Sequence, residues 1–418
     1  MNAWRKLHKA NPNSHGVSGI TITSFKNNLD EQLLSIQKKL RSGTFSFGPN
    51  RAVAILKQNG NYRPLQIPEI QDRVVLKSLA IELEERFNQT IQQSKNVSFA
   101  YQKKVGIRDA INKMVSLYDS GYSIVLEADI INYFGEVDKN RLLHEQIFPN
   151  LPDDSINSLI SSGLSQKVEG VSKLPKEAQK AFDGIENGIP QGNALSPLLS
   201  NIFLSPFDQF LIKRNRQLIR YADDFIVLCK DKTEALTVFN ESKEFLKNEL
   251  DLELHSLDSD KSKIVDPKLE EFIFLSIQFD GNEFYPSSES FNRLKNKILS
   301  LCNSKGSGID VINLLIKIKN RLEGWTSAYY YTDMGRYVSE LDFFVDRQLY
   351  LALRKFKWNF VRNTLGTIPR KFKKHKSSRD CMSRIQRKHS GIPLVKNLLE
   401  EKRQNDPLVY QKDLINAN

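Results

Sequence analysis

Cysteine is scarce in this sequence: there are three, Cys229, Cys302 and Cys381, and they lie far apart. No Cys-x-x-Cys pair occurs, which argues against a zinc knuckle, and three scattered thiols do not suggest a disulfide framework. The sequence also lacks an apolar run long enough to span a bilayer, and its first residues, MNAWRKLHKANPN, hold no apolar signal segment. We therefore expect a protein of the reducing cytoplasm with no membrane partner.

Acidic residues are in deficit, since 61 Lys and Arg stand against 49 Asp and Glu and give a net charge of +12. Such a surplus fits either high solubility or a polyanionic partner such as nucleic acid. The distribution favours nucleic acid, because basic residues cluster between Arg362 and Lys388, where Asp380 is the only acid. The cluster includes Arg370, Lys371, Lys373, Lys374, Lys376, Arg379, Arg384 and Arg387.

The spacing of apolar residues predicts strands and helices side by side in the first two-thirds of the chain and helices after Ser290. The expected strands are 52–56, 62–67, 122–128, 217–221, 225–229, 272–279 and 283–285, and the expected helices are 24–40, 76–87, 197–213 and 234–250. Asn59-Gly60 and Asp280-Gly281 are typical hairpin turns. This order indicates an α+β fold.

Two adjacent acids, Asp223 and Asp224, stand at a predicted tight turn between apolar strands. Alone, the pair fits a plain Asx-type turn about as well as a functional site. A third acid, Asp129, ends the predicted strand 122–128. Carboxylates held together repel unless cations neutralise them, and magnesium prefers carboxylate and phosphate oxygens. Two such ions roughly 4 Å apart can stabilise both the attacking and the leaving oxygen of a phosphoryl transfer.

Four segments resemble the sequence motifs of reverse transcriptases, in the order in which that family has them. RPLQIPEIQDRVV at 63–75 resembles the fingers motif, and ADIINYF at 128–134 resembles the motif of the first catalytic aspartate. GIPQGNALSPLLSNIFL at 188–204 resembles the PQG-containing segment, and YADD at 221–224 resembles the YxDD box. On these motifs the chain is identified as a member of the reverse transcriptase family.

The resemblance implies an RNA-directed DNA polymerase with a right-hand architecture. We expect an α+β fold with fingers and a palm, built from an antiparallel sheet plus helices, followed by an α-helical thumb and a basic C-terminal helical region. The expected parts are an N-terminal extension at 1–50, fingers at 51–120 with an insertion at 150–187, a palm at 121–285, a thumb at 286–360 and a basic RNA-binding region at 361–418.

The resemblance also implies roles for single residues. Asp129, Asp223 and the backbone carbonyl of Ile130 would hold two Mg²⁺ ions, which Mn²⁺ can replace, and Asp224 would support the site. Phe134 would sit under the sugar and exclude a 2′-hydroxyl, although the residue also fits a plain core aromatic. The other nucleotide-binding candidates are Lys57 and Arg63, which suit a triphosphate, together with Gln191, Gly192, Ala222 and either Lys261 or Lys263.

Residues 15–29 and 41–65 resemble the first part of group II intron reverse transcriptases, and 324–331 resembles their thumb. Trp325 and the neighbouring tyrosines either pack between thumb helices or stack on RNA. Three departures stand out. The segment FAYQKKVGIRDAI lacks the GFRPGR-like motif that is usual in these enzymes. Gly135 stands where they usually have an aspartate, and Phe274-Leu275-Ser276-Ile277 replaces their FLG box.

No cysteine pairs for an HNH endonuclease occur, and the landmarks of retron and diversity-generating enzymes are absent. The sequence therefore most resembles the bacterial defence-associated reverse transcriptases, which act with a structured non-coding RNA and protect against phage. The implied partners are that RNA as template or scaffold, dNTPs and the cDNA product. A group II intron maturase without an endonuclease is one alternative, and an RNA-binding splicing factor with an unused palm is another. The candidate RNA-binding residues are Arg370, Lys371, Lys373, Lys374, Lys376 and Arg379.

Overall fold

The computed structural model describes the chain except for residues 8–10, 58–59, 304–309, 356–380 and 407–418. The chain divides into two compact units, Met1–Val265 and Asp266–Asn418. The division falls inside the predicted palm of 121–285, and the five-part assignment of domains stays a prediction. The predicted α+β architecture, with its mainly antiparallel sheets, is confirmed. Among the described residues, no helix is long and apolar enough to cross a membrane.

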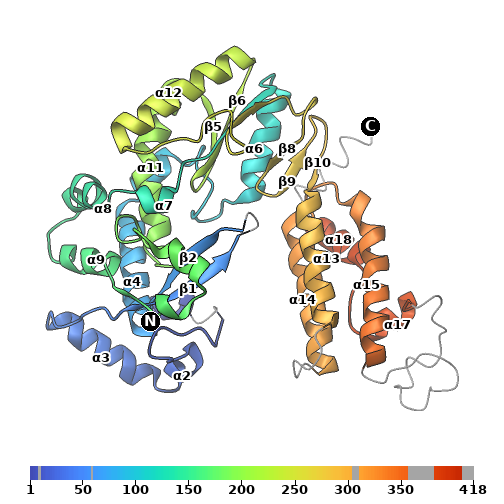
Figure 1. Cartoon of the computed structure of the whole chain (residues 1–418), viewed down its shortest axis with the longest axis horizontal. Coiled ribbons are helices and arrows are strands. Elements are labelled where there is room, and N and C mark those ends of the chain that lie inside the picture. Colours follow the sequence, from blue (N-terminus) through green and yellow to red (C-terminus); the bar gives the residue numbers. More distant parts are fainter. Residues whose placement is uncertain (8–10, 58–59, 304–309, 356–380, 407–418) are drawn as a thin grey trace. The chain divides into compact units, whose positions relative to one another are not determined.

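The first unit begins with helices and a hairpin (Figure 1). Its elements up to the palm are α1 (Asn2–Leu7), α2 (Ile22–Asn27), α3 (Leu29–Arg41), β1 (Asn50–Leu56), β2 (Tyr62–Ile67), α4 (Ile70–Arg86), α5 (Asn88–Gln93) and α6 (Ile107–Asp119). The single helix predicted over 24–40 is wrong, because Asn28 leaves helical geometry between α2 and α3. Thr21 fixes the start of α2 by accepting a hydrogen bond from the backbone N–H of Ser24 at 3.0 Å.

A four-stranded antiparallel sheet forms the centre of the first unit, in the order β5-β6-β3-β7. Its strands are β3 (Ile124–Ala128), β5 (Gln217–Tyr221), β6 (Asp224–Cys229) and β7 (Lys263–Val265), and the helices α11 (Ser196–Lys213) and α12 (Lys232–Leu250) pack against it. β3 and β6 are almost fully buried, which explains why both read as continuous apolar runs. The tightly packed core gives the acids at the strand ends a rigid support.

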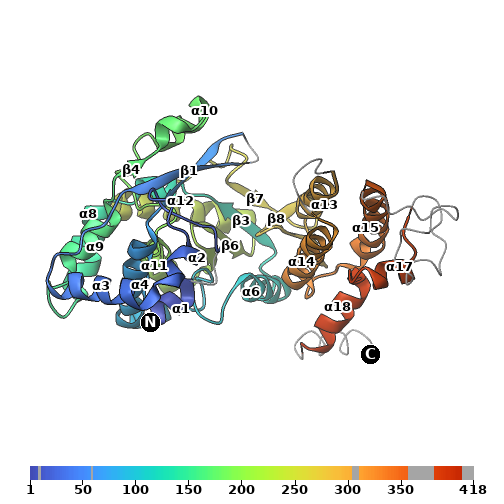
Figure 2. The same cartoon turned by 90° about the horizontal axis from the view of Figure 1, so that it is seen from below.

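Short elements join β3 to α11. They are α7 (Tyr133–Glu136), α8 (Lys139–Arg141), η1 (Leu142–Ile147), η2 (Phe148–Asn150), α9 (Asn157–Leu164), β4 (Val168–Glu169), η3 (Val171–Lys173), α10 (Lys176–Gln179) and η4 (Lys180–Phe182). β4 adds to the β1–β2 hairpin by pairing in parallel with the start of β1 (Figure 2). Part of the 150–187 segment thus pairs with the β1–β2 hairpin, and its assignment as a fingers insertion stays a prediction.

The second unit starts with three short antiparallel strands and continues as helices. Its elements are β8 (Phe272–Phe274), β9 (Ile277–Phe279), β10 (Phe284–Pro286), α13 (Ser288–Asn303), α14 (Val311–Tyr329), α15 (Gly335–Lys355), α17 (Arg384–His389) and α18 (Val395–Gln404). The single strand predicted over 272–279 is wrong, because Leu275 and Ser276 take positive φ angles of 53° and 65° and turn the chain between β8 and β9. α13 and α14 lie side by side in both views (Figures 1 and 2).

Trp325 belongs to the core of this helical unit and is only 8% exposed. Its ring lies 6.0 Å from that of Phe291 and 5.3 Å from that of Tyr329, and its indole N–H donates to Ser290 at 3.3 Å. Buried aromatic side chains with a satisfied polar tip are typical of packing. Of the two interpretations of Trp325, the structure therefore supports packing between helices.

Candidate active site

The three predicted catalytic acids converge at one edge of the central sheet. In the β3–β6 pairing Ala128 lies opposite Phe225, so Asp129, the next residue, lies beside Asp224 at the start of β6. Tyr221 pairs with Asp224 across a two-residue turn that holds Ala222 and Asp223. Ala222 has a φ of 61°, a conformation that a hairpin turn of this kind requires. The YADD turn is therefore a tight β-hairpin, as predicted.

Burial and neighbouring carboxylates raise the pKa of both acids of the YADD turn. Burial raises the pKa of Asp223, and the carboxylate of Asp129 adds to this, while a hydrogen bond from the backbone and the guanidinium of Arg63 oppose it. Partial burial, then Asp223, then Asp129 raise the pKa of Asp224 to about 7, although its side chain still reaches solvent. Like charges crowded in this way favour either protons or added cations.

Basic side chains surround Asp129. The ammonium of Lys261 lies 3.4 Å from Asp129 Oδ2, and the ring of His255 lies 4.0 Å from the same oxygen. Lys263 instead lies 3.5 Å from the carboxylate of Glu127. The sequence left Lys261 and Lys263 as equal candidates for a nucleotide contact, and the structure brings Lys261 to the carboxylate of Asp129. The sequence does not predict that His255 lies near Asp129, because the two residues are brought together by a β-bridge between Ile130 and Leu254.

The bridge between Ile130 and Leu254 also determines where the backbone carbonyl of Ile130 points. The backbone N–H of Ile131 donates to Glu253 at 2.8 Å, and that of His255 donates to the carbonyl of Asp129 at 3.1 Å. In an antiparallel pair whose neighbours make both hydrogen bonds, the enclosed residue directs its own carbonyl away from the partner. The carbonyl of Ile130 is therefore not used by the bridge, which suits its predicted role as a metal ligand.

A buried arginine, Arg220, donates a hydrogen bond to the backbone of the YADD turn. Arg220 and Asp208 are both fully buried and form a two-pronged ion pair with distances of 2.7 and 2.6 Å. Burial lowers the pKa of Arg220, but the carboxylate of Asp208 outweighs it and leaves that pKa raised. The guanidinium also donates to the carbonyl of Ala222 at 2.8 Å and to Asn201 at 3.1 Å. Asn201 in turn donates to the carbonyl of Ala100 at 2.8 Å.

Sequence reasoning missed this network. An arginine inside the otherwise apolar strand Gln217–Tyr221 is the signal that a buried acid must accompany it, because a lone buried charge is too costly. The partner cannot be chosen from the sequence alone, since Asp208 and Asn201 belong to a helix that packs against the strand.

The nucleotide-binding candidates Lys57, Arg63, Phe134 and Gln191 lie on the β1–β2 hairpin, in α7 and in the PQG segment. Lys57 and Arg63 are exposed on the β1–β2 hairpin, and Arg63 lies close enough to lower the pKa of Asp223. Phe134 is partly buried, and its backbone carbonyl accepts a hydrogen bond from Ile189 at 2.9 Å. The carbonyl of Gln191 accepts one from Gln66 of β2 at 2.8 Å. The PQG segment thus connects the Phe134 turn to the hairpin.

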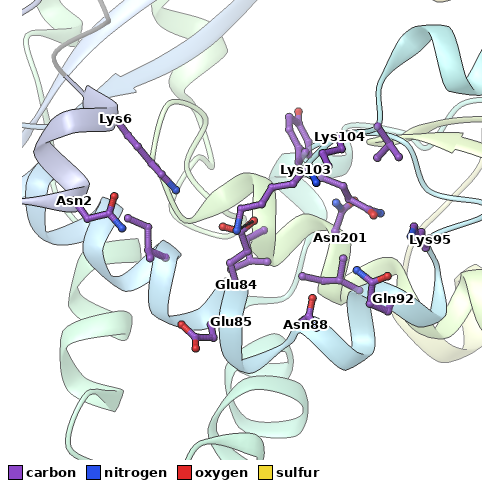
Figure 3. A pocket seen from close by; sticks show the side chains of 16 residues that line it. Asn2, Lys6, Glu84, Glu85, Asn88, Gln92, Lys95, Lys103, Lys104 and Asn201 are labelled. Carbon is purple, nitrogen blue, oxygen red and sulfur yellow. Dashed lines mark ion pairs between the residues drawn. The ribbon is translucent and has the colours of Figure 1, made fainter.

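A cavity of about 710 Å³ lies between α1, α4, α5 and the loop 101–105 (Figure 3). Its lining includes Lys6, Lys95, Lys103 and Lys104 together with several amide side chains, and Figure 3 shows Lys103 reaching toward Glu84, with which it pairs at 3.1 Å. Tyr101 also lines the cavity. Burial, then the charge of Asp223, raises the pKa of its hydroxyl.

The predicted RNA-binding residues cannot be compared with this geometry. Arg370, Lys371, Lys373, Lys374, Lys376 and Arg379 lie outside the described residues. Of the wider basic cluster, Arg387 is described, and it is buried in an ion pair with Asp342 at 2.8 Å and with Asp346 at 3.2 Å. That arginine therefore stabilises the helical unit.

The chain belongs to the reverse transcriptase (RNA-dependent DNA polymerase) family, whose domain matches residues 55–279. Protein YkfC of Escherichia coli K12 is 28% identical over 299 residues, which cover 62% of this chain and 74% of YkfC. The group II intron-encoded protein LtrA of Lactococcus lactis is 27% identical over 199 residues, 47% of this chain but only 31% of LtrA. These findings confirm the predicted family and its polymerase class.

Among solved structures, a partial Cas6-RT-Cas1–Cas2 complex is similar to this chain, with a TM-score of 0.34 and 24% identity. The match covers 59% of this chain and 40% of that chain. Similarity at this level does not bear on function.

Proposed function

We propose that this protein synthesises DNA on an RNA template by nucleotidyl transfer at Asp129, Asp223 and Asp224. The observation that carries the proposal is the strand register, which sets Asp129 beside Asp224 and places Asp223 on the intervening turn. Three carboxylates on rigid strand ends form the acidic centre that phosphoryl transfer to a primer needs.

Reverse transcriptases generally use divalent metal ions, and the site suits them. Among the described residues no group of three or more His, Cys, Asp or Glu side chains is arranged to hold a metal ion. Magnesium does not need such a group, since it takes one or two carboxylates plus substrate phosphates. Asp129, Asp223 and the carbonyl of Ile130 would hold two Mg²⁺ ions, for which Mn²⁺ can substitute. When bound, the ions supply charge to the attacking and leaving oxygens.

The remaining residues bind and orient the nucleotide. Arg63 and Lys57 contact the triphosphate from the hairpin, where a guanidinium and an ammonium suit phosphate oxygens. Phe134 contacts the sugar and leaves no room for a 2′-hydroxyl. Gln191, Gly192 and Ala222 line the pocket through their backbones. Lys261 compensates the charge of Asp129 until a cation arrives.

The lysine-lined cavity suits the RNA template. Single-stranded RNA is bound by basic grooves with an aromatic side chain on which a base can stack, and the half-exposed Tyr101 lines this cavity together with four lysines and two acids, Glu84 and Glu85. Changing Lys103 and Lys104 to glutamine should raise the KM for template several-fold and weaken its dependence on salt. Lys232 and Lys243, exposed on α12, give the matched control pair.

The polymerase proposal is tested by extension of a DNA primer annealed to an RNA template, with purified protein, dNTPs and MgCl₂. We expect products whose length follows the template and whose formation stops when a chelator is added. Extension by the wild-type protein that is independent of template, or no extension with any template–primer pair, would contradict the proposal.

We further propose that the enzyme works with a structured non-coding RNA in bacterial antiphage defence. The sequence resemblance and the basic cluster support this role. Folded RNA is read largely by shape and phosphate contacts, and neutralising Lys371, Lys373, Lys374 and Lys376 should weaken RNA binding while leaving synthesis on a homopolymer template. An unchanged affinity and salt slope would reject that assignment.

The similarity to LtrA favours one second function, that of a group II intron maturase. Sequencing the RNA and cDNA that co-purify with the protein separates the two. One abundant non-coding RNA with matching cDNA supports the defence role, whereas spliced exons that flank an intron support the maturase.

A further inference from the structure

Gly188 touches the backbone of the residue that we propose as the sugar-selecting side chain. A Cβ built on Gly188 would lie 2.0 Å from the carbonyl oxygen of Phe134 and 2.6 Å from both Cα and the carbonyl carbon of Gly135. All three are backbone atoms, which cannot swing aside as the end of a side chain can. Its φ lies outside the left-handed region, so the position requires glycine for space rather than for conformation.

The turn that carries Phe134 is held tightly. Asn132 takes a φ of 45°, its carbonyl accepts from the N–H of Gly135 at 2.8 Å, and its amide donates to Glu136 at 2.9 Å. A Cβ on Gly135 would lie 2.3 Å from the amide nitrogen of Asn132. This contact is with the end of a side chain, whereas those of Gly188 are with backbone atoms, so Gly188 is the glycine that the close approach of the turn and the PQG segment requires.

The ring of Phe134 rests on a rigid base. The neighbouring ring of Tyr133 lies 5.5 Å away at an interplanar angle of 80°. Tyr133 is buried, and its hydroxyl donates to the carbonyl of Ser200 at 2.9 Å. Because burial and this hydrogen bond hold Tyr133 in place, we expect a displacement of the Phe134 backbone to move the ring of Phe134.

The other end of the PQG segment is equally close to the fingers hairpin. A Cβ on Gly192 would lie 2.7 Å from the carbonyl oxygen of Gln66, and Gly192 has a φ of 104°. Gln66 belongs to β2, the strand that carries Arg63. The five residues from Gly188 to Gly192 therefore set the spacing between the Phe134 turn and the strand with the triphosphate-binding candidate.

We propose that Gly188 is a positioning residue for sugar selection: the absence of a Cβ there sets the position of Phe134 against the sugar of the incoming nucleotide. This inference rests on the proposed polymerase function. A deoxynucleotide and a ribonucleotide differ by one oxygen, so discrimination by contact depends on a placement finer than an atomic radius. A misplacement of about 1 Å in an active site can change a rate about 100-fold.

The test compares kcat/KM for a dNTP and for the matching rNTP, with full-length protein on one RNA template and DNA primer. In Gly188→Ala the preference for the dNTP should fall about tenfold or more. In a Phe134→Ala background the same change should alter the preference less than about twofold, because the two residues act through one contact. Gly106→Ala is the matched control, since its Cβ would meet no atom within 4 Å.

If thermal unfolding shows that Gly188→Ala does not fold, a second variant, Gly135→Ala, tests the same inference. Gly135→Ala places its new carbon against the end of a side chain, so the turn can yield. Its preference for the dNTP should fall several-fold, and adding Asn132→Gly, which removes the opposing amide and suits the positive φ, should restore it.

The possible outcomes separate the inference from the function on which it rests. A wild-type protein without polymerase activity would reject the proposed function. Active, folded glycine variants with an unchanged dNTP preference would overturn the inference alone. The inference would also be overturned if Gly188→Ala changed the dNTP preference equally in the wild-type and Phe134→Ala backgrounds.

Discussion

The buried ion pair between Arg220 and Asp208 leads to a prediction in which stability and activity separate. Arg220→Met keeps much of the side-chain volume but leaves the carboxylate of Asp208 buried without a counter-charge. Arg220 is also the donor that contacts the carbonyl of Ala222, at 2.8 Å. The single variant therefore loses both the pair and the support of the YADD turn.

The size of the effect follows from burial. Both side chains are 0% exposed, so solvent does not screen them. Breaking a buried pair by removing one partner costs about 3–5 kcal/mol, a large share of the 5–15 kcal/mol by which a domain is ordinarily stable, to order of magnitude. Replacing both partners with apolar residues is about neutral. Arg220→Met with Asp208→Leu should therefore recover most of the lost stability.

The assay pairs urea unfolding with primer extension. The single variant should have a lower unfolding midpoint and low activity. The double variant should unfold near the wild-type midpoint, yet its kcat should stay about 10- to 100-fold down, because Ala222 no longer has its donor and small misplacements are costly. Arg216→Met, which breaks a partly exposed pair between the residue just before β5 and Glu234 and Glu241 of α12, is the matched control.

Two results would refute this reasoning. A loss of less than about 1 kcal/mol in the single variant would mean that Asp208 is not left buried and unpaired. Full activity in the double variant would mean that Arg220 does not hold the YADD turn.

Two further predictions follow from single side chains. Burial, partly opposed by a hydrogen bond from Gly48, raises the pKa of Asp72 to about 7, so the folded state favours the protonated acid and stability is lost as pH rises from about 4 through 7. Asp72→Asn should remove most of that slope and raise the unfolding midpoint at pH 8, and a slope equal to that of the wild type would contradict the assignment. Lys261 lies 3.4 Å from Asp129 but is 57% exposed, so Lys261→Met should lower Tm only slightly without metal, by the equivalent of about 0.2–1 kcal/mol. In Lys261→Met the rise in Tm caused by MgCl₂ should be larger than in the wild type, because the carboxylates no longer have the ammonium of Lys261 as a counter-charge. An equal rise in the variant and the wild type would contradict this prediction.

The catalytic hairpin could be predicted because its signals are local. Apolar strands flank Asp223 and Asp224, a two-residue turn fits between them, and a third acid ends another apolar strand. Only the register of β3 against β6 was missing, and it turns out to set Asp129 beside Asp224.

Other parts depend on contacts between distant residues or on unusual backbone angles. The ion pair of Arg220 joins a strand to a helix, and no spacing rule selects Asp208 as the partner. The turn at Leu275 and Ser276 uses positive φ angles without glycine, so its sequence reads as a continuous strand. Lys261 and Lys263 are two residues apart, and only the start of β7 at Lys263 decides which carboxylate each one meets.

The central claim is that the acids of the YADD turn perform DNA synthesis, and one double variant tests it most directly. Asp223→Asn with Asp224→Asn keeps the shape of both side chains, removes their charge, and should not lower Tm, since burial and crowding disfavour that charge in the folded state. Asp153→Asn with Asp154→Asn changes an adjacent exposed pair and serves as the control. The account predicts that a folded YADD variant extends no primer on RNA while the control does; dNTP incorporation at the wild-type rate by that variant would contradict it.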